Sequence, residues 1–179
     1  MTEVISHQDL EKYFIRYSEL DSHQSSFHPF DTRLERYQRT RYSVVGRPKE
    51  GTKDGKYHDE GVGFSVVYLK IDAGKGVGMH SHASSEVFIP MSGKWRVQIE
   101  GGMESVAFPW DVLSVPPNLL HGLENISENT AFIMAINSGN TGAPIRLSPE
   151  LIEELRSNGE DVSDIEIPGE SLSKSKSNI

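Results

Sequence analysis

Two histidines and a glutamate stand close together in the segment GMHSHASSE, which covers residues 78–86. His80 and His82 are two residues apart, so in a strand they point to the same face, as two neighbouring ligands of one metal ion must. Glu86 can join them from the next strand after a turn at ASS, and His121 follows the run DVLSV. Four nitrogen and oxygen donors of this kind suit iron, manganese, nickel or zinc. The two histidines alone fit a polar loop that binds nothing equally well.

The spacing around these residues resembles the cupin family, whose motifs are G(X)5HXH(X)3E(X)6G and PXGXXHXXXN. The positions that fit are Gly74, His80, His82, Glu86 and Gly93 in the first motif, and Pro116, His121 and Asn125 in the second. The resemblance covers residues 61–137 and is closest to small single-domain microbial cupins. It implies an all-β fold, a jelly-roll barrel or double-stranded β-helix, with short N-terminal and C-terminal helices.

The same resemblance implies one divalent transition-metal ion inside the mouth of the barrel. The implied ligands are His80, His82, Glu86 and His121, with Glu86 contributing one oxygen. Fe2+ is the first choice, with Mn2+, Ni2+ and Zn2+ as alternatives. Cupins of this size commonly form homodimers, so the resemblance also implies a second copy of the chain as partner.

The second motif is expected to begin with a further glycine, ahead of the part quoted above, and this position is Trp110; the glycine inside the quoted part is replaced by Asn118. Asparagine tolerates a positive φ better than other non-glycine residues, so we expect Asn118 to hold the same turn. Trp110 has two interpretations: an ordinary backbone conformation at this position, or a ring that covers the end of the barrel. Neither replacement changes a proposed ligand.

Alternating apolar and polar residues between Gly63 and Asn137 predict an antiparallel sandwich or barrel of short strands. The predicted strands cover 64–71, 86–90, 94–100, 104–108, 111–115 and 130–136, and an earlier strand over 34–45 could pair with a neighbouring subunit. A helix is predicted over 6–20, and another over 148–159 from Ser148 or Pro149 to Gly159. The predicted organisation is 1–60 as helix, strand and loop, 61–147 as barrel, 148–159 as C-terminal helix and 160–179 as a disordered tail.

Composition narrows the function classes. The 179-residue chain has a formal net charge of −8, which argues against a nucleic-acid partner because phosphate binding needs basic patches. It has no cysteine, so thiolate metal sites and disulfides are excluded. No apolar run approaches the roughly 20 residues of a membrane span, and no export pattern precedes the first helix. We therefore expect a cytoplasmic protein without a membrane partner.

Three function classes remain open at this stage. The first is an O2-dependent dioxygenase that acts on a small enolisable or hydroxylated carbonyl compound, because two coordination positions stay open beside four protein ligands. The second is an isomerase or lyase with zinc or manganese as Lewis acid, for which Tyr42, Tyr68 or His58 could serve as base. The third is a binding module without catalysis.

Few residues outside the ligand set can be assigned to a substrate pocket. Phe88 lies two residues after Glu86 and so shares its face, although filling the core explains it as well. The other pocket candidates are Tyr68 and Arg96. Arg36, Arg39 and Arg41 could bind a carboxylate substrate, or could protect an edge strand from pairing.

Overall fold

The protein is described from a computed structural model that covers residues 11, 13–20, 23–24, 33–46, 63–139 and 145–163. The elements are η1 (Tyr17–Glu19), β1 (His23–Gln24), η3 (Glu35–Tyr37), β2 (Thr40–Val45), β3 (Phe64–Ile71), β4 (Gly76–Ser81), β5 (Glu86–Pro90), β6 (Trp95–Ile99), η4 (Glu100–Gly102), β7 (Met103–Ala107), β8 (Leu113–Val115), β9 (His121–Asn125), β10 (Ala131–Ser138), β11 (Arg146–Leu147) and α2 (Pro149–Ser157).

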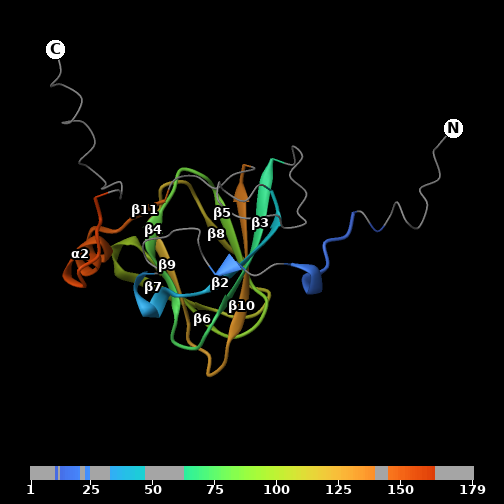
Figure 1. The fold of residues 1–179 in the computed structure, drawn as a ribbon, viewed down its shortest axis with the longest axis horizontal. Coiled ribbons are helices and arrows are strands. Elements are labelled where there is room, and N and C mark those ends of the chain that lie inside the picture. The colour runs from blue at the N-terminus through green and yellow to red at the C-terminus, as the bar shows by residue number, and fades with distance from the viewer. Residues whose placement is uncertain are drawn as a thin grey trace, which may run out of the picture.

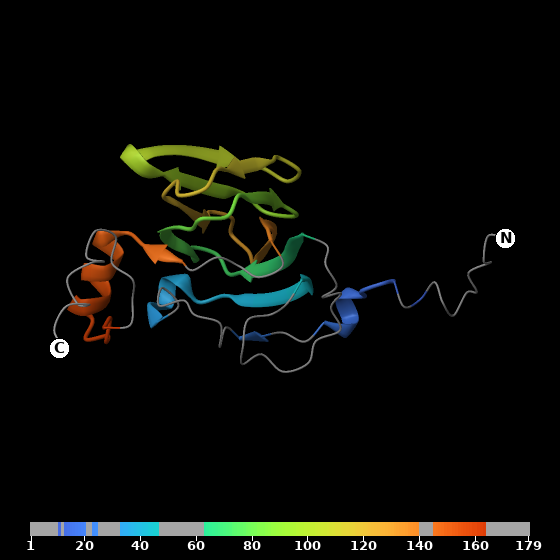
Figure 2. The same cartoon turned by 90° about the horizontal axis from the view of Figure 1, so that it is seen from above.

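These strands form two antiparallel sheets that face each other (Figures 1 and 2). One sheet has the order β1-β2-β3-β10-β5-β8, and the other has the order β11-β4-β9-β6-β7. Strands that are consecutive in the chain often lie in different sheets, as β4 and β5 do, so the chain winds around a common interior. This arrangement is the expected double-stranded β-helix, and the apolar residues that alternate along its strands point to the inner face.

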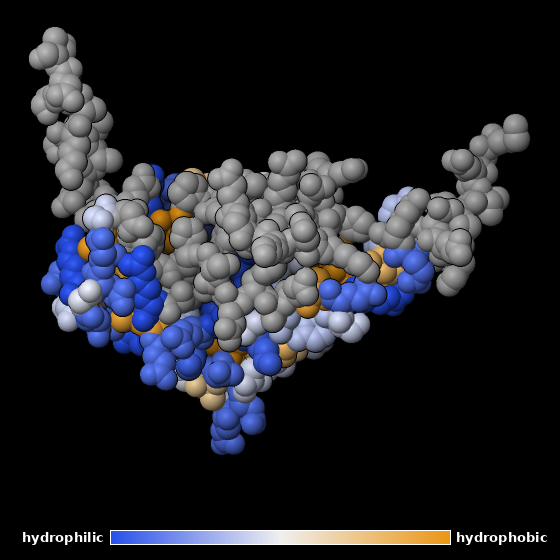
Figure 3. Space-filling view, in the orientation of Figure 1, coloured by the Kyte–Doolittle hydropathy of each residue, from blue (hydrophilic) through white to orange (hydrophobic). Residues whose placement is uncertain are grey.

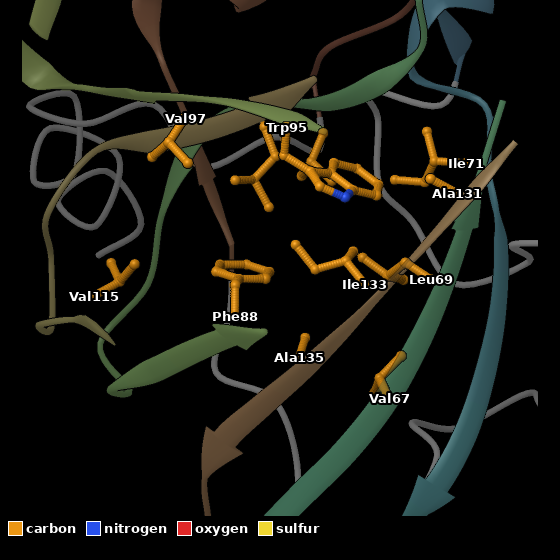
Figure 4. Packing of buried hydrophobic residues seen from close by; sticks show 12 residues of the cluster. Val67, Leu69, Ile71, Phe88, Trp95, Val97, Val115, Ala131, Ile133 and Ala135 are labelled. Atoms are coloured by element: carbon orange, nitrogen blue, oxygen red, sulfur yellow. The ribbon is translucent and has the colours of Figure 1, made fainter. Parts of the chain in front are cut away.

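The interior is filled by apolar residues that alternate along the strands. Val67, Leu69 and Ile71 of β3 are buried, while the residues between them are not fully buried. Phe88 and Trp95 face this row from other strands of the barrel (Figure 4). The remaining members of the buried cluster are Val77, Val97, Val115, Leu123, Ala131, Ile133 and Ala135. Burial of each large apolar side chain contributes about 1.5–3 kcal/mol, so the apolar interior can hold the barrel together without the ion.

Helix α2 packs outside the barrel through an apolar stripe (Figure 1). Ser148 caps the helix by accepting a hydrogen bond from the backbone N–H of Leu151, and Pro149 occupies the first turn. Gly159 follows the helix with a φ of 80°. The stripe lies against Leu34 and Leu147, and its members are Leu151, Ile152 and Leu155. The C-terminal helix predicted over 148–159 is present, and it is docked through this stripe.

All six strands predicted between Gly63 and Asn137 are present, two of them with the predicted bounds. The earlier prediction over 34–45 is only half right, because β2 begins at Thr40 and a 3-10 helix precedes it. Leu34 packs in the α2 cluster instead of continuing the strand. The outer edge of β2 is also paired within the chain, since β1 bonds to it at Thr40 and Arg41.

The helix predicted over 6–20 does not extend through residues 13–20, where the structure has only the 3-10 turn Tyr17–Glu19. The large apolar side chains of this segment are mostly exposed, at 59% for Tyr13 and 49% for Phe14. A short helix with no buried face has little to stabilise it. Residues 47–62 and 164–179, which include most of the predicted loop and tail, lie outside the described residues.

The coloured part of the surface in Figure 3 is mostly hydrophilic, and its hydrophobic areas are small and separate. This agrees with the net charge of −8. No helix in the described ranges has the length and hydrophobicity that a membrane span requires.

Candidate metal centre

The four predicted ligands come from three strands and one turn, and all four are buried. His80 lies near the end of β4, His82 directly after it, Glu86 at the start of β5 and His121 at the start of β9. Their exposed fractions are 6%, 5%, 6% and 0% in that order. Strands β4 and β9 are paired so that His80 lies opposite His121. Antiparallel pairing therefore brings together histidines that are 41 positions apart in the sequence (121 − 80).

One donor atom from each of the four side chains lies within 4.8 Å of all the others. The rings of His80 and His121 are 4.3 Å apart between centroids, and His82 is 5.7 Å from His80 and 5.5 Å from His121. The structure thus brings together all four residues that the sequence predicts, on one inner surface.

Each of the three histidines has one ring nitrogen held by a backbone carbonyl. Nδ1 of His80 donates to the carbonyl of Gly78 at 2.8 Å, Nδ1 of His82 to that of Ser84 at 2.9 Å, and Nδ1 of His121 to that of Leu119 at 2.9 Å. A carbonyl oxygen can only accept, so Nδ1 carries the proton in every case. Each Nε2 is then the atom with a free lone pair, as metal ligation requires.

A positive charge is needed where these atoms meet, and either a proton on His82 or a metal ion can supply it. Nε2 of His82 lies 2.7 Å from Oε2 of Glu86, a distance at which a lone pair and a carboxylate would repel each other without a positive charge between them. Nε2 of His121 is 3.4 Å from the same oxygen but lacks hydrogen-bond geometry. Among the described residues, Nε2 of His121 is the one buried side-chain nitrogen or oxygen atom that has no hydrogen-bond partner. An unpartnered buried nitrogen is costly, and a divalent metal ion at this point would satisfy it.

Glu86 is oriented so that a single oxygen faces the histidines. Its Oε1 accepts a hydrogen bond of 3.0 Å from Nδ2 of Asn137, which lies opposite it in the pairing of β5 with β10. Its Oε2 is the atom near His82 and His121. This geometry favours one-oxygen ligation by Glu86.

The protonation states of the free site also suit metal binding. Burial, reinforced by the neighbouring His121, lowers the pKa of His80 to about 3, so this imidazole is neutral at pH 7. Burial of Glu86 favours its neutral form, but the adjacent imidazoles of His121 and His82 outweigh that effect and hold its pKa at about 2. For His82, burial is outweighed by the hydrogen bond and charge of Glu86, which raise its pKa. His82 therefore binds the proton that a metal ion would displace.

The sequence comparison agrees with this geometry. Residues 67–137 match the family profile described as "Cupin domain". This segment resembles a cupin domain in sequence and in fold. It contains all four candidate ligands, and it covers most of the barrel predicted over 61–147.

Two solved structures share the cupin fold with this chain at low sequence identity. The cupin 2 domain-containing protein from Halorhodospira halophila is 17% identical, with a TM-score of 0.52 over 68% of this chain and 78% of that one. The DMSP lyase DddQ from Ruegeria pomeroyi DSS-3 is 14% identical, with a TM-score of 0.51 over 62% of this chain and 51% of that one. The chain thus spans about half the length of this lyase. No curated protein matches the sequence significantly.

The two replaced glycines of the second cupin motif keep the backbone that glycine would have. Trp110 has a φ of 75° and Asn118 a φ of 65°, and these are the non-glycine residues with positive φ in the described ranges. The interpretation of Asn118 as a substitute for glycine is confirmed, whereas an ordinary backbone at Trp110 is wrong. Its ring is also 75% exposed, so it does not cover the end of the barrel.

The physical reason is the same at both positions. A hydrogen bond of 3.0 Å from the N–H of Asp111 to the carbonyl of Phe108 closes a four-residue turn, with Pro109 second and Trp110 third. The turn from Pro116 to Leu119 has Pro117 second and Asn118 third. Proline in the second place and a positive φ in the third define a type II turn.

The motif residues Gly93 and Asn125 have structural roles at the other end of the cupin barrel. Gly93 has a φ of 76°, and a Cβ there would lie 2.5 Å from the Cβ of Ala131. The amide of Asn125 donates to the carbonyls of Ile71 and Asn129 at 2.9 Å each, and its oxygen accepts from the N–H of Ser127 at 3.0 Å. Asn125 therefore closes this turn.

Of the three predicted pocket residues, the structure brings only Phe88 to the metal centre, where its ring lies 5.8 Å from that of His121. Tyr68 lies on the opposite face of β3 from the buried Val67 and Leu69, so it points away from the interior. Arg96 lies on the outside of β6 and pairs with Glu124. Neither Tyr68 nor Arg96 reaches the site.

Sequence reasoning missed Asn137, which orients Glu86. A signal was present: Ile133 and Ala135 are the inward residues of their strand, and a two-residue period continues this face to Asn137. A polar residue in that position has to have a polar partner inside the barrel.

Proposed function

We propose that the protein is a mononuclear, metal-dependent dioxygenase that uses O2 and acts on a small oxygen-chelating compound, either an enolisable or a hydroxylated carbonyl. Ferrous iron is the proposed native ion. The proposal deepens the cupin assignment and concerns chemistry that the fold alone does not decide.

One observation carries this proposal: the four donor atoms lie together on one inner surface of the barrel, within 4.8 Å of one another. Four protein ligands leave two positions of a six-coordinate ion for other molecules, whereas a structural zinc site is closed by its four ligands. Ferrous iron supplies the one-electron chemistry that O2 requires. The protein residues then have to hold the substrate, orient it and exclude water, and Phe88 provides an apolar wall beside His121.

The positions of the tyrosines favour this reaction over an isomerase or lyase. Those reactions require a base near the substrate, and Tyr42 and Tyr68 were the candidates that can be placed. The two residues lie opposite each other in the pairing of β2 with β3, on the face turned away from the barrel interior. A hydrogen bond with Tyr17 raises the pKa of Tyr42 to about 12, which makes it a poor base at neutral pH. His58, the third candidate, lies outside the described residues.

The test compares iron and zinc in the same protein. Ferrous protein is prepared without oxygen and mixed with a panel of β-diketones and α-hydroxyketones, and O2 consumption is followed after air is admitted. We expect at least one compound to produce a charge-transfer absorption band that bleaches as O2 is consumed. Zinc-loaded protein should bind the same compound, seen as a rise in melting temperature, and consume no O2.

Two other outcomes would replace the dioxygenase proposal. Turnover without O2 by the zinc or manganese form would identify an isomerase or lyase. Ligand binding without reaction by any metal form would identify a binding module. Metal analysis of protein purified without a nickel column identifies the native ion. The homodimer and the cytoplasmic location stay predictions, which sedimentation and fractionation of cells would test.

A further inference from the structure

An arginine and a serine on β2 face the interior of the barrel. Arg41 lies opposite Leu69 and Ser43 opposite Val67 in the pairing of β2 with β3. Directly opposed residues of an antiparallel pair share a face, and both Leu69 and Val67 belong to the buried core. Arg41 and Ser43 therefore point inward, and Ser43 is only 8% exposed. A role for Arg41 in protecting the outside of an edge strand does not fit this orientation.

The guanidinium of Arg41 is held on the side of the metal centre. Its Nη1 donates a hydrogen bond of 3.0 Å to Oγ of Ser43. Ser43 belongs to one row that runs across the sheet to Phe88 through Val67 and Ala135, the last three of which are labelled in Figure 4. The ring of Phe88 in turn lies against His121. The cation and the metal ligands thus face the same part of the interior.

The charge of Arg41 acts on this site. Burial, together with the neighbouring Arg39, lowers the pKa of Arg41 to about 10. The negative charge of Glu86 acts in the opposite direction and offsets part of this lowering. Arg41 therefore remains cationic at neutral pH, close enough to Glu86 for their charges to interact. Both oxygens of Glu86 are engaged, one by Asn137 and the other by the imidazoles.

We propose that Arg41, supported by Ser43, binds a carboxylate of the substrate. The substrate is then a small carbonyl compound with chelating oxygens at the metal and a carboxylate at Arg41. The planar guanidinium presents a fixed fork of N–H donors that matches the two oxygens of a carboxylate. This inference rests on the proposed function, because it names the substrate class of the same site.

The test measures binding and needs no turnover. Zinc-loaded full-length protein is titrated calorimetrically with 2,4-dioxopentanoate and with its methyl ester, which carry the same diketone with and without a negative charge. We expect the acid to bind roughly 10- to 100-fold more tightly than the ester. Arg41→Gln should reduce this preference to less than about threefold while leaving ester binding and zinc content unchanged. Arg41→Lys should retain part of it, and Ser43→Ala should weaken acid binding only.

Arg96→Gln is the matched control, because Arg96 lies outside the barrel and pairs with Glu124; it should keep the full preference. Equal binding of acid and ester by the wild type, or a preference that survives in both Arg41→Gln and Arg41→Lys, would overturn the inference. Loss of zinc in the Arg41 variants would overturn it too, since it would assign Arg41 to the metal centre. The dioxygenase proposal is tested separately, by O2 uptake of the iron form. If that form takes up no O2 but the preference for the acid still depends on Arg41, the dioxygenase proposal is wrong and the carboxylate site is supported.

Discussion

The side-chain amide of Asn137 donates a hydrogen bond of 3.0 Å to Oε1 of Glu86 and so fixes which oxygen of that carboxylate faces the histidines. The contact joins the two strands whose pairing places these residues opposite each other. A ligand carboxylate held in this way loses less rotational freedom when it binds a metal ion. Loss of a partner of this kind commonly lowers metal affinity about 10- to 100-fold.

Replacing Asn137 by alanine should therefore weaken zinc binding by roughly 10- to 100-fold without unfolding the barrel. The dissociation constant is measured by competition with a coloured chelator, and the fold by circular dichroism. Gln98→Ala is the control, because Gln98 donates a comparable hydrogen bond to Glu104 on the surface. Unchanged zinc affinity in Asn137→Ala would mean that this contact does not orient the ligand.

Replacing His121 by alanine should lower the metal content sharply while the protein stays folded. The apolar cluster of the barrel, which includes Trp95 and Phe88, does not depend on the ion for its burial. Metal content is measured by mass spectrometry of the purified variant and folding by thermal melting. Asn129→Ala, a change in an exposed turn, serves as control. Full metal occupancy in His121→Ala would exclude this histidine from the ligand set.

Zinc affinity should fall as pH is lowered through the pKa of His82. That pKa is raised above the ordinary value of 6.5, so the protonated form of His82 becomes abundant below it and competes with zinc. His80, with a pKa of about 3, and Glu86, with one of about 2, stay unprotonated between pH 5 and 8 and do not compete in this range. Affinity is measured by chelator competition across that range. A flat profile would contradict ligation by His82.

Trp110→Gly should stabilise the protein by about 0.5–1 kcal/mol. A left-handed conformation costs a non-glycine residue about 1–2 kcal/mol, glycine in the unfolded chain offsets part of the gain, and the ring is 75% exposed, so little burial is lost. Chemical denaturation measures the free energy of unfolding. Trp110→Ala tests the reason, because alanine retains the Cβ and should bring no such gain. Equal stabilisation by both changes would attribute the effect to the exposed ring.

Leu155→Ala should destabilise the protein by about 2–5 kcal/mol, since Leu155 is fully buried in the cluster between α2 and the barrel. Truncation after Asn140 should lower the melting temperature for the same reason. Glu153→Ala, on the exposed side of the helix, should change stability by less than about 0.5 kcal/mol. A melting temperature unaffected by either the Leu155 change or the truncation would show that α2 contributes nothing to the stability of the barrel.

The ligand set could be predicted from the sequence because it depends on local periodicity and on a motif with fixed spacing. The direction of Tyr68 could not. Even-numbered residues such as Glu86 and Phe88 point inward on β5, whereas even-numbered Tyr68 points outward on β3. Alternation gives the relative faces within one strand, but each turn resets which face is the inner one.

Other features depend on contacts between distant parts of the chain. The apolar stripe of residues 13–17 predicts a helix, but in the described structure much of that stripe stays exposed. The contact between Asn137 and Glu86 requires the pairing of β5 with β10. The positive φ of Trp110, by contrast, had a local signal in the preceding Pro109, which the replacement of glycine by a large aromatic residue obscured.

The pairing of His80 with His121 makes metal uptake a measure of correct strand alignment. Side chains alternate between the faces of a strand, so a slip of one residue between β4 and β9 would turn one of these imidazoles out of the barrel. Such a molecule could keep much of its backbone hydrogen bonding, but it would turn the inward apolar residues of that strand outward and be unable to hold the ion. An ion present during refolding would then act as a selector, because it binds the correctly aligned molecules and draws the population toward them.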